Sequence, residues 1–187
     1  MSQSLTLLLL GAALMALLTQ FWSRRLSFRA QLPDHYSAEG PAFDITRTLN
    51  GPMDAEGMIF DFRGRMTSRF TARFNAHWQG ANGTMTEVFQ YSTGRSQNRK
   101  WTMHVGNDGT FRATAPDIIG EAKGIQSGAT VRMTYRIKLP QEAGGHVLDV
   151  TDWMYLVENG TVLNKSEFRK FGIKVAELIA TFRKAAA

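Results

Sequence analysis

The sequence contains no cysteine among its 187 residues. This absence excludes disulfides, thiolate nucleophiles, cysteine-ligated zinc, iron–sulfur clusters and lipids attached through cysteine. The sequence also lacks a G-x-S-x-G elbow, a phosphate-binding glycine loop and a dinucleotide fingerprint. The four histidines show no metal-ligand spacing. No cofactor and no metal site are therefore predicted.

Acidic residues are in the minority. The chain has 22 Lys and Arg against 16 Asp and Glu, a formal net charge of +6. Such a balance favours anionic partners. No recognition helix or paired aromatic RNA-binding motif accompanies it, so nucleic acid is not a predicted partner.

Charge is also missing from a long N-terminal segment. Leu5–Trp22 reads LTLLLLGAALMALLTQFW, near the lower length limit for a helix that crosses a bilayer. A cleavable signal peptide is the alternative, but it favours basic residues before the apolar run and a small-x-small cleavage site. Neither is present. We therefore predict that residues 1–25 form a single-pass anchor in the inner membrane, and the arginines that follow, the last at Arg29, favour a cytoplasmic body.

The rest of the chain divides into a polar connector at 26–52 and a body at 53–187. In the body, apolar and polar residues alternate with a period of two, most clearly in 66–78 and 129–139. A helix cannot sort residues in this way, whereas a half-buried strand does. Glycine-containing turns separate these runs and favour the positive φ angles of tight hairpins.

The alternation and the turns predict nine strands. Because no helix intervenes, we expect an all-β fold, an antiparallel meander that closes into a lipocalin-like barrel of eight to nine strands. The parity of the hairpins supports this fold: Phe62 is expected opposite Met66, and Trp78 opposite Met85. The predicted strands are 57–63, 65–79, 84–92, 96–105, 109–115, 118–126, 129–139, 146–157 and 160–168.

The C-terminal segment is predicted to form a helix that packs on the barrel. Apolar residues recur there at helical spacing, and Arg183 and Lys184 suit the C-terminal end of a helix. These apolar residues are Phe171, Val175, Leu178, Ile179 and Phe182.

Two charged residues, Glu87 and Arg99, fall on the predicted inner face. A turn near Thr93 places them directly opposite each other. Because unpaired charges inside a barrel are strongly destabilising, we expect the two groups to bond each other. Such a pair is either a structural clasp or part of a ligand site.

Further residues on the inner face support a ligand site. Asp152 points inward by parity, and Asp117 begins a strand whose even positions are small, from Gly120 to Gly124. Small inward residues would leave room for one small ligand, and an apolar cavity with a few polar groups suits an amphiphile. The alternative is a filled core in which the glycines only relieve strand coiling. The candidate ligand-binding residues are Glu87, Arg99, Trp101, Asp117, Tyr135 and Asp152.

The outer face is expected to be basic. Next to an anchor, its arginines would face anionic lipid headgroups, although a merely solvated face remains the alternative. By parity, His77 and His104 also point outward. The outer arginines are Arg65, Arg69, Arg73, Arg132 and Arg136.

A set of short motifs runs from Glu87 to Gly172. They are Glu87-Val-Phe89, Gly94, Arg99-Lys-Trp101, Asp117-Ile-Ile-Gly120-Glu-Ala122-Lys-Gly124, Gly128, Thr151-Asp152-Trp153-Met154-Tyr155, Asn164 and Lys170-Phe171-Gly172. With them, about 130 residues of the chain, from the region of Asn50 and Gly51 to the predicted C-terminal helix, resemble a bacterial family catalogued as domain of unknown function 3833.

The resemblance implies a small lipocalin-like protein, adds Asn164 to the ligand-binding candidates, and assigns no activity. Members often carry a lipoprotein signal, which implies a periplasmic location, whereas this chain lacks the lipobox cysteine. The family is associated with cyclopropane-fatty-acid-synthase-like methyltransferases, which implies a role in membrane fatty-acid modification and such an enzyme as a partner.

Three functional hypotheses follow. The first is a membrane-anchored barrel that binds a fatty-acyl or phospholipid ligand. The second is an enzyme that isomerises, or inserts oxygen into, an unsaturated or methylated acyl chain, with Asp152, Glu87 or Tyr135 as the catalytic candidates. The third is a non-catalytic scaffold for a lipid-modifying enzyme, which a filled barrel would favour.

Overall fold

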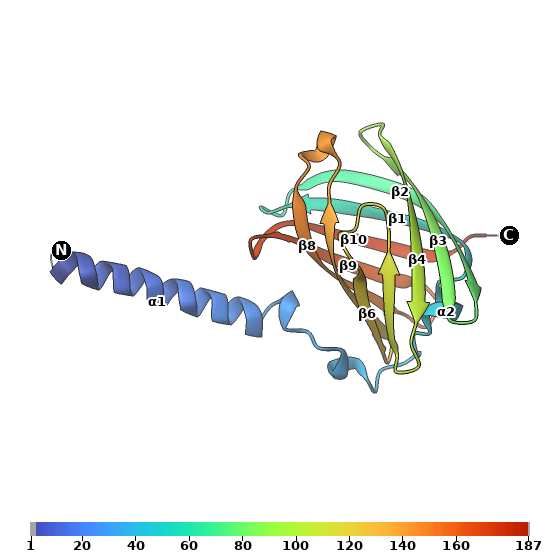
Figure 1. Cartoon of the computed structure of the whole chain (residues 1–187), viewed down its shortest axis with the longest axis horizontal. Helices are drawn as coiled ribbons and strands as arrows, with labels where there is room; N and C mark the ends of the chain where they lie inside the picture. Colours follow the sequence, from blue (N-terminus) through green and yellow to red (C-terminus); the bar gives the residue numbers. More distant parts are fainter. Residues whose placement is uncertain (1–2, 187) are drawn as a thin grey trace.

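The computed structural model describes residues 3–186. Outside this range lie residues 1 and 2 of the predicted anchor and residue 187 of the predicted body. The side chains of Ser23 and Arg24 are also not described. The described chain begins with helix α1 (Gln3–Arg25), which extends away from the rest of the molecule (Figure 1). Its segment Gln3–Trp22 is long and apolar enough to cross a membrane, a test that an N-terminal signal sequence also passes.

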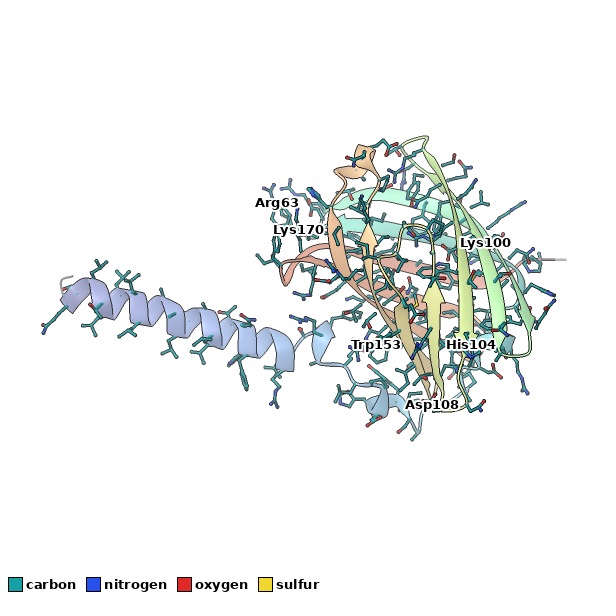
Figure 2. All side chains as sticks on the ribbon, in the orientation of Figure 1. Arg63, Lys100, His104, Asp108, Trp153 and Lys170 are labelled. Carbon is teal, nitrogen blue, oxygen red and sulfur yellow. The ribbon has the colours of Figure 1, made fainter. Side chains whose placement is uncertain are left out.

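The connector packs against the outside of the barrel. It contains the short helices η1 (Phe28–Ala30), η2 (Pro33–Tyr36) and α2 (Ile45–Thr48). The Tyr36 ring meets the Trp153 ring edge-on at 5.4 Å, and the Tyr155 hydroxyl donates to Gln31 Oε1 at 2.7 Å. Trp153 (Figure 2) is therefore fully buried although it lies on the outer face of its strand.

The body is a closed barrel of ten antiparallel strands, in which consecutive strands pair and β10 pairs with β1. The predicted antiparallel barrel is confirmed, with ten strands in place of eight or nine. The strands are β1 (Gly51–Asp61), β2 (Met66–Gln79), β3 (Asn82–Tyr91), β4 (Ser96–Val105), β5 (Thr110–Thr114), β6 (Ala122–Ser127), β7 (Thr130–Lys138), β8 (Val147–Leu156), β9 (Val162–Lys170) and β10 (Ile173–Lys184). A short helix, η3 (Gln141–Ala143), lies between β7 and β8.

The predicted C-terminal helix is wrong. Residues 173–184 form β10, which pairs with β9 on one side and with β1 on the other. Without this strand the barrel would have two open edges, so closure outweighs the local helical spacing. Alternation fits the segment equally well, because Leu178 and Phe182 line the interior while Ile179 is 43% exposed.

The first two hairpins form with partners shifted from the predicted ones. Met85 lies opposite Ala76 rather than Trp78, since the turn between β2 and β3 has only two residues. This two-residue shift leaves each side chain of that hairpin on its predicted face. In the first hairpin a bulge at Ile59 and Phe60 places Phe60, not Phe62, opposite Met66, and Ile59 opposite Ser68. Beyond the bulge the shift is one residue, so the predicted inner face of β1 is reversed and Ile59 lines the interior.

The connector closes one end of the barrel. Ile45 and Leu49 are buried there, and the Trp78 indole donates to the Leu49 carbonyl at 2.7 Å. Consecutive antiparallel strands alternate in direction, so the β1–β2, β3–β4, β7–β8 and β9–β10 connections all lie at the opposite end. We call that end the mouth.

Candidate functional site

A cavity of about 350 Å³ occupies the barrel interior. Its lining is mostly aromatic and aliphatic, and it extends toward the mouth, where Arg95, Pro140 and Ala143 border it. The large apolar side chains on its wall include Phe70, Phe74, Met85, Phe89, Met103 and Phe182. The polar side chains come chiefly from β3, β4, β7, β8 and β9.

Arg99 is the cation of the polar wall. Its Nε and Nη2 atoms donate to Asp117 Oδ2 at 3.0 and 2.5 Å, and its Nη1 lies 3.9 Å from Glu87 Oε2. Glu87 and Arg99 are cross-strand partners, as predicted. The two groups form an ion pair, while Asp117, which was not expected, is the hydrogen-bonding partner of the guanidinium.

The cluster holds two carboxyls for one guanidinium, and its protonation follows from that imbalance. Burial raises the pKa of Glu87 to about 7, against the lowering effect of Arg99 and with the help of the Asp152 and Asp117 charges. Glu87 Oε2 and Asp117 Oδ1 are buried and have no hydrogen-bond partner within the described protein. Glu87 therefore exchanges a proton near neutral pH, and two acceptor atoms are left for a ligand or water.

Asp152 forms a second polar cluster on β8 and β9. Its Oδ1 accepts hydrogen bonds from Asn164 Nδ2 and, at 3.0 Å, from Ser166 Oγ. Asn164 also donates to the Trp153 carbonyl at 3.0 Å, which fixes its orientation. Burial raises the pKa of Asp152 to about 6, although the Asn164 and Ser166 bonds oppose the shift.

Tyr135 and Trp101 connect the two clusters. Their rings meet edge-on at 5.7 Å, and the Arg99 guanidinium lies 5.6 Å from the Trp101 ring. Burial and the Asp152 charge raise the pKa of Tyr135 well above its ordinary value. The phenol therefore keeps its proton and can donate a hydrogen bond into the cavity.

The structure brings all seven predicted ligand-binding residues to the cavity wall: Glu87, Arg99, Trp101, Asp117, Tyr135, Asp152 and Asn164. Their role in binding stays a prediction. Asp117 reaches the cavity from the loop between β5 and β6, because β6 begins only at Ala122.

The small residues do not create the cavity. Gly120 lies in the β5–β6 loop, and a Cβ at Gly124 would come within 2.1 Å of the Phe111 ring. The Phe111 ring therefore occupies the space next to Gly124. The room in the barrel arises from its ten-strand circumference.

Sequence reasoning missed Ser166, Gln97 and Arg95, which also line the cavity. Ser166 shares the inner face of β9 with Asn164, so the alternation of that strand was the available signal. Among residues 3–186, no three His, Asp or Glu side chains are placed to hold a metal ion.

The basic exterior is present in part. Arg65, Arg69, Arg73 and Arg136 are exposed, as are His77 and His104. Arg132 is half-buried, and its buried Nε has no hydrogen-bond partner in the described part of the chain.

Comparison with known proteins places the chain in a family. Residues 24–184 match the profile of the proteins of unknown function DUF3833. The chain belongs to that family. The comparison with curated proteins gives no match.

Two solved structures share the fold of this family member. The S-type phycobiliprotein lyase CPES from Guillardia theta has a TM-score of 0.57 at 4% identity, over 84% of this chain and 99% of the lyase. A DUF3598-family protein of unknown function from Nostoc punctiforme has a TM-score of 0.55 at 10% identity, over 79% of this chain and 51% of its own. The lipocalin-like character of the barrel is thus confirmed at the level of the fold.

Proposed function

We propose that this DUF3833 protein is a membrane-anchored barrel that binds a fatty-acyl or phospholipid ligand and serves membrane fatty-acid modification. The observation that carries the proposal is an apolar cavity with one ionisable wall inside a lipocalin-like barrel. In this proposal residues 1–25 are the anchor, 26–52 the connector and 53–187 the binding domain.

The shape and lining of the cavity fit an amphiphile. Its volume of about 350 Å³ lies within the range of about 300–1,000 Å³ that ligand pockets occupy. An acyl chain would lie against the phenylalanines of β2 and β3, since burying apolar surface there is favourable. The polar end would meet Arg99, Tyr135 and the carboxyls of Glu87, Asp117 and Asp152.

The charge of the wall specifies how an anionic end would bind. Two Arg99 nitrogens are occupied by Asp117, while Nη1 lies toward Glu87. A ligand carboxylate near Nη1 is repelled when Glu87 is ionised and accepted when it is protonated. Because the pKa of Glu87 is about 7, fatty-acid affinity should increase as the pH falls from about 8 to about 6.

The direct test uses the full chain, purified in detergent and delipidated, titrated with a fluorescent fatty acid and a fluorescent phospholipid. We expect saturable uptake of at least one probe, with the pH dependence of fatty-acid binding lost in Glu87→Gln. Absence of uptake of both probes would refute the proposal.

A cavity-filling variant separates binding inside the barrel from binding to its surface. Ala180 is buried and lines the cavity, so Ala180→Leu should reduce uptake. Val88 is 44% exposed on β3, and Val88→Leu is the matched control that should bind normally. Equal uptake by the two variants would place the probe elsewhere.

A catalytic role is the second candidate, and the two buried carboxyls favour it. Glu87 and Asp152 have pKa values raised to about 7 and about 6, and groups that exchange protons near neutral pH in a cavity are typical of acid–base sites. Deletion of the gene should then alter the cellular fatty-acid profile. Full restoration by folded Glu87→Gln and Asp152→Asn variants would leave binding as the function.

The remaining parts of the proposal rest on the family and on α1. A cyclopropane-fatty-acid-synthase-like methyltransferase is the proposed partner, and co-purification of the two proteins tests it. The scaffold hypothesis expected a filled barrel, whereas a cavity is present. Reporter fusions at the C-terminus would decide between the cytoplasmic and periplasmic sides of the inner membrane.

A further inference from the structure

Two neighbouring hairpins at the mouth expose large apolar side chains. Phe171 is 91% exposed, Ile173 70% and Phe62 62%. The hairpins are adjacent because β1 pairs with β10, with Asp61 opposite Ala176 close to their tips. Exposed apolar groups gathered at one place indicate a contact surface.

Basic side chains surround these apolar groups. The Arg63 guanidinium lies 5.0 Å from the Phe62 ring, and the Lys170 ammonium 5.7 Å from the Phe171 ring. Asp61 offsets part of this charge and also accepts the Arg63 and Arg65 backbone N–H groups. We call this surface the hairpin-tip patch, made of Phe62, Arg63, Arg65, Met66, Lys170, Phe171 and Ile173.

The backbone at Phe171 adds an independent observation. Phe171 and Gly172 form the two-residue turn between β9 and β10, with φ angles of 51° and 79°. Such turns favour Asn, Asp or Gly, and a bulky side chain at positive φ is strained. A strained residue that is also almost wholly exposed contributes little to the core, which indicates a role outside the folded domain.

The position of the patch identifies its partner. Arg63 and Lys170 lie on the side of the barrel from which α1 extends (Figure 2), and both hairpins point in the direction of that helix (Figure 1). Aromatic side chains flanked by cations are the composition that binds at the headgroup level of anionic membranes.

We propose that the hairpin-tip patch rests on the anionic surface of the bilayer that α1 crosses, with Phe62, Phe171 and Ile173 at the headgroup level. The proposal rests on the proposed anchoring by α1 and does not depend on which ligand the cavity binds. Because the patch borders the mouth, this docking would let a lipid pass between the bilayer and the cavity.

The absence of cysteine allows a direct test with single-cysteine variants of the full chain. A fluorophore is attached at Ile173→Cys in the patch or at Asp108→Cys, which lies in the turn after β4 at the opposite end of the barrel (Figure 2). The protein is reconstituted into liposomes of phosphatidylcholine, with or without phosphatidylglycerol. Quenching by spin-labelled lipid reports bilayer contact, and quenching by iodide reports exposure to water.

In phosphatidylglycerol liposomes we expect lipid quenching at 173 several-fold greater than at 108, with protection from iodide at 173 alone. Iodide access at 173 equal to that at 108 would overturn the proposal, and so would identical protection without phosphatidylglycerol. Flotation of the protein with the liposomes tests anchoring by α1 separately, and the fluorescent-lipid titration tests the cavity.

Charge variants in the Ile173→Cys background test the electrostatic part. Arg63→Gln with Lys170→Gln should reduce lipid quenching several-fold. Lys100→Gln with Lys123→Gln removes equal charge from exposed positions on β4 and β6 and should have little effect. Equal losses in both pairs would mean that net charge, rather than the patch, attracts the bilayer.

Phe171→Asn distinguishes membrane contact from a structural role. Asparagine tolerates positive φ, so the variant should unfold at a higher denaturant concentration while lipid quenching at 173 decreases. Unchanged quenching in this folded variant would contradict a membrane contact for Phe171.

Discussion

Replacing Glu87 with glutamine should stabilise the barrel at alkaline pH and have little effect in acid. The pKa of Glu87 rises from its usual value of 4.5 in the unfolded chain to about 7 in the barrel, chiefly because the group is buried. Below pH 4.5 the carboxyl is protonated in both states. Between pH 4.5 and about 7 only the unfolded chain ionises, so the wild-type protein loses stability as the pH rises.

The size of the effect follows from the same two pKa values. A shift from 4.5 to about 7, at about 1.4 kcal/mol per pH unit, makes ionisation of Glu87 cost on the order of 3 kcal/mol by pH 8. Glutamine has no charge to bury, so Glu87→Gln avoids this cost. Asp152, with its pKa raised to about 6, should add a smaller loss at lower pH.

Urea unfolding of the full chain in detergent, followed by tryptophan fluorescence at pH 4, 6 and 8, measures the difference. The stability of Glu87→Gln relative to wild type should increase between pH 4 and pH 8 and then level off. Glu158→Gln, in the exposed turn between β8 and β9, is the control for loss of a surface charge and should change stability little. A difference between Glu87→Gln and wild type that is constant with pH would refute the buried, proton-exchanging carboxyl.

Two further predictions test the packing of the structure. Arg99→Met should lower the free energy of unfolding by about 3–5 kcal/mol, because it leaves buried carboxylates without a cation. Adding Asp117→Leu should restore part of this free energy, and urea unfolding measures both changes. At Gly128 (φ 52°) an added Cβ would lie 1.7 Å from the Tyr36 carbonyl oxygen, so Gly128→Ala should displace the connector and expose it to limited proteolysis. Gly160 also has positive φ (80°) but open space around it, and Gly160→Ala should leave the connector protected; equal cleavage of both would contradict the packing.

The alternation of residues was sufficient to predict the barrel and the cross-strand pair. Glu87 and Arg99 lie opposite each other because a short hairpin fixes which positions meet. The identity of the bonding partner was not predictable in this way. Asp117 reaches Arg99 from a loop, and strand parity carries no information on where a loop places its side chains.

The existence of the cavity could be predicted only as one of two alternatives. The small size of Gly124 predicts space, but the Phe111 ring fills the position next to it. How much room remains depends on strand number and on which side chains interdigitate across the barrel. Neither quantity follows from the alternation of one strand at a time.

Closure of the barrel by β10 explains both why the predicted C-terminal helix is wrong and why Phe171 is exposed for the proposed membrane contact. The helical spacing of apolar residues places Phe171 on the packed face of a helix, yet it lies at the exposed tip of the last hairpin. Pairing of β10 with β1 joins segments about 120 residues apart, and a spacing pattern within one segment cannot detect such pairing. Once closure makes the segment a strand, Phe171 has no core to enter, and the proposed contact with an anionic bilayer would take its exposed ring out of water.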